Sequence, residues 1–188
     1  MPESGPFEKT LSRLAAAFDR DSIPYMLVGG LAVLVHGIPR LTRDIDVTVL
    51  LDPSGVARLI AALGREFGVL VADPESFAAE TRVLPMEGPD GTRVDVIFAG
   101  LPFEEAAIGR ARPERLGAVE VRVCTAEDLI LHKIVSERAK DREDVAGILR
   151  TRGADLDLAE LDRTIEALAA DLEHPEMLEA WRRLRAGA

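Results

Sequence analysis

Residues 25–51 read YMLVGGLAVLVHGIPRLTRDIDVTVLL and place two carboxylates, Asp44 and Asp46, at the start of an apolar run. Alternate residues of a strand point to the same face, so the two carboxylates are expected side by side, about 6–7 Å apart along the strand. Like charges held this close repel each other unless a cation lies between them. Hard cations such as Mg²⁺ choose carboxylate oxygens as ligands. The pattern therefore predicts a strand that binds a metal ion.

A glycine pair, Gly29-Gly30, separates the first apolar run of this stretch from a short helix-like segment over residues 31–36. Glycine lets backbone amides approach a phosphate closely because it has no side chain. The N-terminus of the helix that follows is itself an anion site. A phosphate site followed by an acid pair is suited to a nucleoside triphosphate and its metal ion.

A third acid, Asp95, stands in the apolar segment RVDVIF of residues 93–98, where an unpaired carboxylate is costly. If this strand lies beside the Asp44 strand, three carboxylates converge on one patch. Three acids can hold two divalent ions, which stabilise the attacking and leaving oxygens of an in-line phosphoryl displacement. The alternative is that Asp95 pairs with Arg82 or Arg93 across the strands.

The rest of the chain indicates a mixed architecture. Apolar runs and turn residues predict strands, a β-hairpin and helices as far as residue 124, whereas every segment after Thr125 has helical periodicity. We therefore expect an α+β fold, with a mixed sheet of about five strands and flanking helices. Two domains are expected: a catalytic core over residues 1–124 and a C-terminal helical region over residues 125–188 that closes the cleft.

Composition limits the functional classes. The chain has 188 residues, of which 47% are hydrophobic, and a net charge of −10, which argues against a general basic nucleic-acid binder. A local basic patch remains compatible with this charge, and four arginines form a candidate: Arg110, Arg112, Arg115 and Arg122. One cysteine, no targeting segment and no apolar run long enough for a membrane span predict a cytoplasmic protein with no membrane partner.

These motifs together resemble a known family. Gly29-Gly30, a 13-residue spacer, the Asp44-Ile-Asp46 strand and the later Asp95 are similar to the signature of the DNA polymerase β-like nucleotidyltransferases. The fuller pattern resembles the small bacterial nucleotidyltransferases of the AbiEii toxin type, over roughly residues 22–150. The residues that carry this closer resemblance are Gly37, Arg40, Thr42 and Arg43, the block from Glu127 to Lys133, and Asp141 with Asp144.

The resemblance implies a nucleotidyltransferase-like fold and a role for each matching residue. Asp44, Asp46 and Asp95 would bind Mg²⁺ or Mn²⁺, and Asp95 could accept the proton of the attacking hydroxyl. Gly29 and Gly30 would hold the triphosphate. Three further residues come from the C-terminal block: Lys133 would reach the triphosphate, and Asp144, with Asp141 behind it, would position the substrate or Lys133. The acceptor hydroxyl would attack the α-phosphorus and release pyrophosphate.

Several alternatives stay open. Arg40 and Arg43 could neutralise the triphosphate, bind the acceptor or only balance the local negative charge. Lys133 and the KDRED run around Asp141 and Asp144 are also typical of a solvated helix surface.

The acceptor is open as well. It could be an RNA or tRNA end, a protein side chain, or a small molecule such as an aminoglycoside. The AbiEii resemblance implies the toxin of a toxin–antitoxin pair, with a cognate antitoxin as a partner. A non-catalytic nucleotide-binding protein on the same scaffold is the competing class of function.

Overall fold

A computed structural model describes residues 6–136 and 138–187. The chain forms two compact units. The sheet unit consists of the N-terminal residues up to Leu31 together with Leu41–Cys124, and the helical unit consists of Ala32–Arg40 together with Thr125–Ala188. The helical unit therefore includes a short internal segment, residues 32–40, in addition to the C-terminal region.

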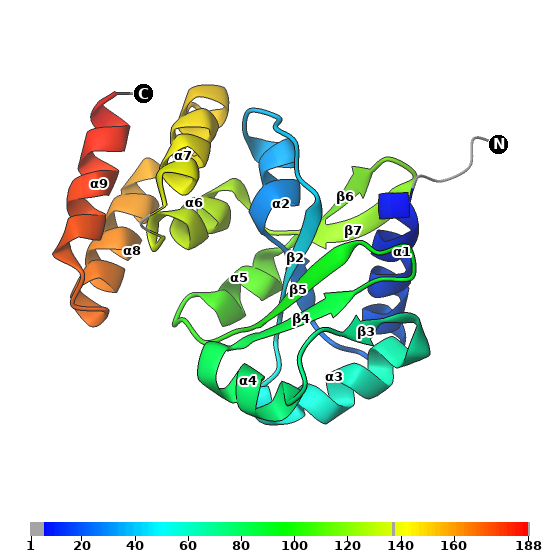
Figure 1. Cartoon of the computed structure of the whole chain (residues 1–188). Helices are drawn as coiled ribbons and strands as arrows, with labels where there is room; N and C mark the ends of the chain where they lie inside the picture. Colours follow the sequence, from blue (N-terminus) through cyan, green and yellow to red (C-terminus); the bar gives the residue numbers. More distant parts are fainter. Residues whose placement is uncertain (1–5, 137, 188) are drawn as a thin grey trace. The chain divides into compact units, whose positions relative to one another are not determined.

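The sheet unit is built on a mixed sheet (Figure 1). Within the described residues the sheet has seven strands in the order β3-β4-β5-β2-β1-β7-β6. The pairs β2·β5 and β1·β7 are parallel, and the other neighbours are antiparallel. The strands are β1 (Tyr25–Leu27), β2 (Asp44–Val49), β3 (Gly68–Val69), β4 (Val83–Glu87), β5 (Arg93–Phe98), β6 (Arg112–Leu116) and β7 (Val119–Val123).

The core of this unit follows from alternation in the central strands. Ile45 and Val47 on β2, like Val94 and Val96 on β5, are fully buried, whereas the acids between them are not. The amphipathic helix α1 (Pro6–Arg20) buries Phe18 and contacts β7 and α3 (Val56–Leu63). Two further helices belong to the unit, α4 (Pro74–Thr81) and α5 (Glu104–Arg110).

The α+β fold class is confirmed, and the sheet is larger than predicted. Strand β6 is one that local pattern does not indicate, because its sequence RPERL has no alternating apolar residues. It forms because a turn at Gly117 folds it back onto β7, with Arg115 opposite Glu120. Tertiary pairing at the sheet edge thus outweighs a weak local strand signal.

The helical unit contains α6 (Ala126–Ile134), α7 (Ala139–Arg152), α8 (Leu158–Asp171) and α9 (Pro175–Ala186). Thr125 caps α6 by accepting a hydrogen bond from the Asp128 N–H, and Asp157 caps α8 in the same way through Glu160. The helices meet through buried side chains such as Ile148 and Trp181. Within the described residues, none of the helices has the length and apolarity that crossing a membrane requires.

Candidate active site

Three carboxylates lie on one face of the central strands. In the parallel register of β2 and β5, Asp46 is the direct partner of Asp95, and Asp44 lies two residues before Asp46 on the same face. Asp44 is exposed, while Asp46 and Asp95 are half-buried. The sequence left open which strand would lie beside the Asp44 strand, and the sheet topology places Asp95 there.

The glycine pair lies against this acid face. Helix α2 (Gly29–His36) begins at Gly29 rather than at Leu31 as the sequence predicted, so both glycines belong to its first turn. Gly29 has a φ of +59°, and a methyl group at its Cα would overlap the carboxylate oxygen Oδ2 of Asp46. The first N–H groups of a helix have no partner within the helix. The structure therefore brings potential phosphate donors next to an acid that suits a metal ion.

Asp95 has a protein partner in this arrangement. The guanidinium of Arg93 donates from Nε to both carboxylate oxygens at 3.1 Å. This hydrogen bond, with further attraction from Asp44 and Asp46, raises the pKa of Arg93. Arg82, the other predicted partner, instead donates to the backbone carbonyls of Phe98 and Ala99. The predicted pairing with Arg93 is therefore present, but it runs along β5 and not across the strands.

The donor chemistry of this face fits a hard divalent cation, because it offers carboxylate oxygens from neighbouring strands. As the side chains stand, no group of three or more His, Cys, Asp or Glu residues in the described stretches is placed to hold a metal ion. For Asp95 to join Asp44 and Asp46 as a ligand, its carboxylate would have to exchange Arg93 for the cation.

A second cluster of charges lies in the helical unit. The Nζ of Lys133 is 2.5 Å from Asp141 Oδ1 and 2.9 Å from Asp144 Oδ2. All three side chains are buried, with 7%, 1% and 4% of their surface exposed. The solvated-surface alternative is therefore wrong for these three residues, whereas Lys140, Arg142 and Glu143 of the same run are exposed. The sequence missed Arg138, which donates to Asp141 at 2.6 Å.

Arg40 completes this cluster, whereas Arg43 does not join it. Arg40 donates from Nε and Nη2 to the two oxygens of Asp144, at 2.8 and 2.9 Å. Arg43 is exposed and has no hydrogen bond or ion pair with any residue that the structure describes. Charge patterning alone could not distinguish Arg40 from Arg43. The tertiary structure distinguishes them by their contacts.

The two buried acids keep their charge despite burial. Burial acts to raise the pKa of Asp144, but hydrogen bonds from Arg40 and Lys133 outweigh it and lower that pKa below its ordinary value. Burial likewise acts to raise the pKa of Asp141, and hydrogen bonds from Lys133 and Arg138 reverse the effect and lower it. Both carboxylates are therefore ionised at neutral pH.

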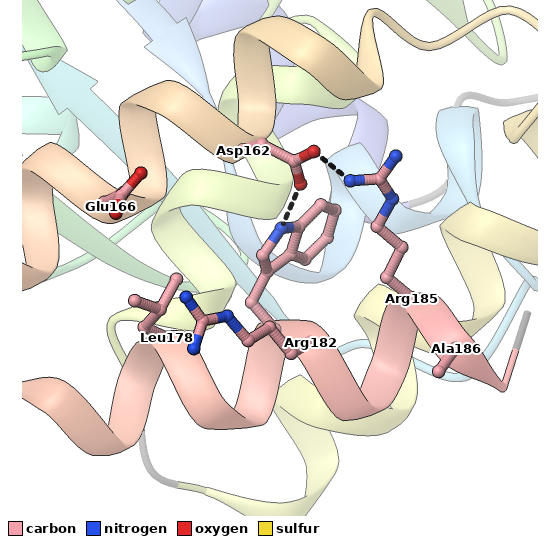
Figure 2. A pocket seen from close by; sticks show the side chains of 7 residues that line it. Asp162, Glu166, Leu178, Arg182, Arg185 and Ala186 are labelled. Atoms are coloured by element: carbon pink, nitrogen blue, oxygen red, sulfur yellow. Dashed lines mark hydrogen bonds and ion pairs between the residues drawn. The ribbon is translucent and has the colours of Figure 1, made fainter.

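A pocket of about 540 Å³ in the helical unit contains none of the predicted site residues. Figure 2 shows its lining on α8 and α9, where Asp162 accepts hydrogen bonds from the buried indole of Trp181 and from Arg185. Trp181 is 1% exposed and is therefore a packing residue of this unit. The Asp162 carboxylate is occupied by these two donors, so it offers no free acid for catalysis.

The predicted basic patch is dispersed over three elements of the sheet unit. Arg110 ends α5, Arg112 and Arg115 lie on the edge strand β6, and Arg122 lies on β7. The guanidinium of Arg122 donates to the Ala111 carbonyl at 2.7 Å, and Arg115 lies opposite Glu120. This mixed-charge hairpin is a weaker candidate for a nucleic-acid surface than the sequence alone indicated.

Comparison with known proteins identifies the family. The family model of the nucleotidyl transferase AbiEii toxin, type IV toxin–antitoxin system, matches residues 9–186. The chain belongs to this family. It is therefore an AbiEii-type nucleotidyltransferase, and the family implies a nucleoside triphosphate substrate and the toxin half of a type IV toxin–antitoxin system. No curated protein sequence is significantly similar to this AbiEii-family chain.

Solved structures share its fold. The solution structure of the antibiotic-resistance factor ANT(2″)-Ia is similar with a TM-score of 0.59 and 19% identity, over 89% of this chain and 95% of that one. The crystal structure of ANT(2″)-Ia with adenylyl-2″-tobramycin gives a TM-score of 0.55 at 19% identity, covering 87% and 97% of the two chains. An antigenic nucleotidyltransferase-like protein from Paracoccidioides brasiliensis gives 0.55 at 17% identity, covering 94% of each.

Proposed function

We propose that this AbiEii-family enzyme transfers a nucleoside monophosphate from a nucleoside triphosphate to an acceptor hydroxyl, with Mg²⁺ or Mn²⁺ as cofactor. One observation carries the proposal: Asp46 is paired in register with Asp95, and the backbone of Gly29 lies against the Asp46 carboxylate. The proposed phosphate site and the proposed metal ligands are thus contiguous within one unit. The competing non-catalytic class predicts a disrupted acid set, which this chain does not have.

Each candidate site residue of the sheet unit has a proposed role. Asp44 and Asp46 would hold the divalent cation, and Asp95 would be a further ligand if its carboxylate exchanged Arg93 for the ion. The cation, when bound, neutralises charge that develops on the transferred phosphoryl group. The amides of Gly29 and Gly30, at the start of α2, bind triphosphate oxygens.

The reaction is an in-line displacement at the α-phosphorus. The acceptor oxygen forms a bond to this phosphorus, the bond to the bridging oxygen of the β-phosphate breaks, and pyrophosphate leaves. Asp95 takes the proton of the attacking hydroxyl. The protein contributes mainly by positioning the reactants and by stabilising charge.

The charge cluster of the helical unit has a supporting role in the proposal. Asp144 and Asp141 fix the position of the Lys133 ammonium group. The short contacts among these buried side chains support a fixed position. Arg40, bound to Asp144, belongs to this framework and helps to hold the segment that leads into β2.

The acceptor that we propose is RNA, and the enzyme would then act as a toxin by modifying an RNA end such as that of tRNA, under control of a cognate antitoxin. A protein side chain is the second candidate acceptor. A small-molecule acceptor is suggested by the fold shared with ANT(2″)-Ia. At 19% identity this likeness shows the fold alone.

The test is label transfer. The full chain is incubated with each nucleoside triphosphate carrying a radioactive α-phosphate, with Mg²⁺ and a bacterial lysate, and RNA, protein and small molecules are then separated. We expect label on RNA with the wild type and none with Asp46→Asn, while the exposed Asp19→Asn control in α1 retains transfer. Equal transfer by Asp46→Asn contradicts the proposed site, and label only on protein or a small molecule contradicts the proposed acceptor.

A further inference from the structure

The loop before the acid strand contains two arginines with opposite environments. Arg40 is held by both oxygens of Asp144, and 24% of its side chain is exposed. Arg43 is exposed and finds no hydrogen-bonding or ionic partner among residues 6–136 and 138–187. A guanidinium without a protein partner is available to an anion from outside the protein.

The residues beside Arg43 show that this part of the loop is anchored. The Thr42 hydroxyl donates to the Asp44 carbonyl at 3.4 Å, and a methyl group at Gly30 would overlap the Thr42 side chain. Thr42 is thus packed on the glycine pair, while Leu41 before it is 80% exposed. Leu41 and Arg43 are thus exposed on either side of an anchored threonine.

We infer that Leu41 and Arg43 form a contact surface for an RNA acceptor, with Arg43 on a backbone phosphate and Leu41 against a base or ribose. This inference rests on the proposed function and names the residues that would bind its acceptor. Arg43 directly precedes Asp44 in the chain, so its long side chain starts one residue from the acid strand that an acceptor must approach. The guanidinium attracts a phosphodiester and repels a polycation such as an aminoglycoside.

The surrounding charge makes this single cation significant. The whole chain carries a net charge of −10, which repels a nucleic-acid backbone at long range. An RNA substrate therefore needs local positive charge close to the reacting residues. In the described part of the sheet unit, Arg93 is paired with Asp95 and Arg122 with a backbone carbonyl, which leaves Arg43 unpaired next to the acid strand.

A triphosphate explains this pair of side chains less well. The proposed site already supplies the triphosphate with the amides at Gly29 and Gly30. An apolar side chain such as Leu41 offers nothing to a triphosphate chain. RNA presents both phosphates and the flat faces of unstacked bases, which is the combination that Arg43 and Leu41 match.

Binding assays test the inference without requiring catalysis. Fluorescently labelled total bacterial tRNA is titrated with the full chain in Mg²⁺, and the fluorescent triphosphate mant-ATP is titrated separately. We expect Arg43→Ala to weaken tRNA binding by about 5-fold and to lower the salt slope by about one, as for the loss of one phosphate contact. Leu41→Ser should weaken tRNA binding about 3-fold with an unchanged salt slope. Neither variant should change mant-ATP binding.

The chain supplies matched controls in the same unit. Arg65→Ala removes an equally exposed arginine without a described partner, and Leu70→Ser removes another exposed leucine. Equal tRNA affinity for Arg43→Ala and Arg65→Ala, no tRNA binding by the wild type, or weaker mant-ATP binding alone would each overturn the inference. Failure of the proposed function gives a different result from failure of this inference. In that case the wild type still binds tRNA and mant-ATP but transfers no label.

Discussion

At the scale of single residues, partners decide roles that residue types leave undetermined. Arg40 and Arg43 are both arginines within four residues of the acid strand, yet Arg40 is an ion-pair partner of Asp144, whereas Arg43 has no partner among the described residues. Asp44 and Asp95 differ in the same way, because only Asp95 has an arginine on its carboxylate. Functional assignments at this site therefore depend on contacts more than on motifs.

The contact between Gly29 and Asp46 gives a sharp prediction. Gly29→Ala should lower nucleotidyl transfer by about 100-fold, because its methyl group must displace the Asp46 carboxylate. Gly64→Ala is the matched control, since Gly64 has a similar φ of +65° and nothing within 4 Å of an added methyl group. Both variants should lose about 1–2 kcal/mol of unfolding free energy through the left-handed backbone conformation.

The measurements are the rate of label transfer and urea denaturation of the same preparations. Activity lost in both variants would trace the effect to backbone strain rather than to Asp46. Activity kept by Gly29→Ala would remove the glycine–acid contact from the site.

A second residue-scale prediction concerns Thr48. Its hydroxyl is fully buried on β2 and has no hydrogen-bond partner within the described residues. A buried polar group without a partner costs about 1–3 kcal/mol, so the nearly isosteric Thr48→Val should raise the free energy of unfolding by about 1 kcal/mol. Urea denaturation measures this change, and a lower stability for Thr48→Val would show that the hydroxyl has a partner in solution.

At the scale of elements, helices α6 and α7 are held together by ion pairs as well as by apolar contacts. Lys133 comes from α6, Asp141 and Asp144 from α7, and Arg40 from the segment after α2. Taking such charges out of water is costly, and the cost is recovered only while every partner is in place. The cluster is therefore sensitive to the loss of any one member.

Asp144→Ala should lower the free energy of unfolding by about 3–5 kcal/mol, because it leaves Arg40 and one contact of Lys133 without a counter-charge. The control is Asp155→Ala, which removes an exposed carboxylate of the same unit and should change stability by less than about 0.5 kcal/mol. Chemical denaturation followed by circular dichroism compares the two. Equal stability of both variants would mean that the Asp144 contacts contribute nothing in solution.

At the scale of the whole molecule, the two units divide the proposed chemistry. The sheet unit contains the acid strand and the glycine pair, and the helical unit contains the charge cluster. The single tryptophan of the chain, Trp181, is buried in the helical unit, so its fluorescence reports on that unit alone. This property makes the pH response of the cluster measurable.

The cluster predicts acid sensitivity of the helical unit. Asp141 and Asp144 have lowered pKa values in the folded protein, so their stabilising contribution is complete above the ordinary carboxyl pKa of about 3.9 and is lost as the pH falls toward the lowered values. Unfolding free energy from Trp181 fluorescence should therefore fall as the pH is lowered from about 4 through the lowered pKa values of the two acids. Asp144→Asn should show a shallower fall, and an equally steep one would assign the acid response to other carboxylates.

Sequence alone determined the features that depend on local spacing. The two-residue repeat of a strand placed Asp44 and Asp46 on one face, and the apolar alternation of residues 93–98 set Asp95 apart from Val94 and Val96. The cap at Thr125 and the helical periodicity after it are equally local. The α+β class and the family both followed from such short-range patterns.

Only the tertiary structure decided which distant side chains meet. Arg40 and Asp144 are 104 positions apart, so no local pattern indicates that they pair or that their cluster buries Lys133. Strand β6 exists through its pairing with β7, and Asp95 lies beside Asp46 because β2 and β5 pair in parallel register. Local conformation follows from backbone geometry and side-chain spacing, whereas the choice of partner follows from the packing of the whole chain.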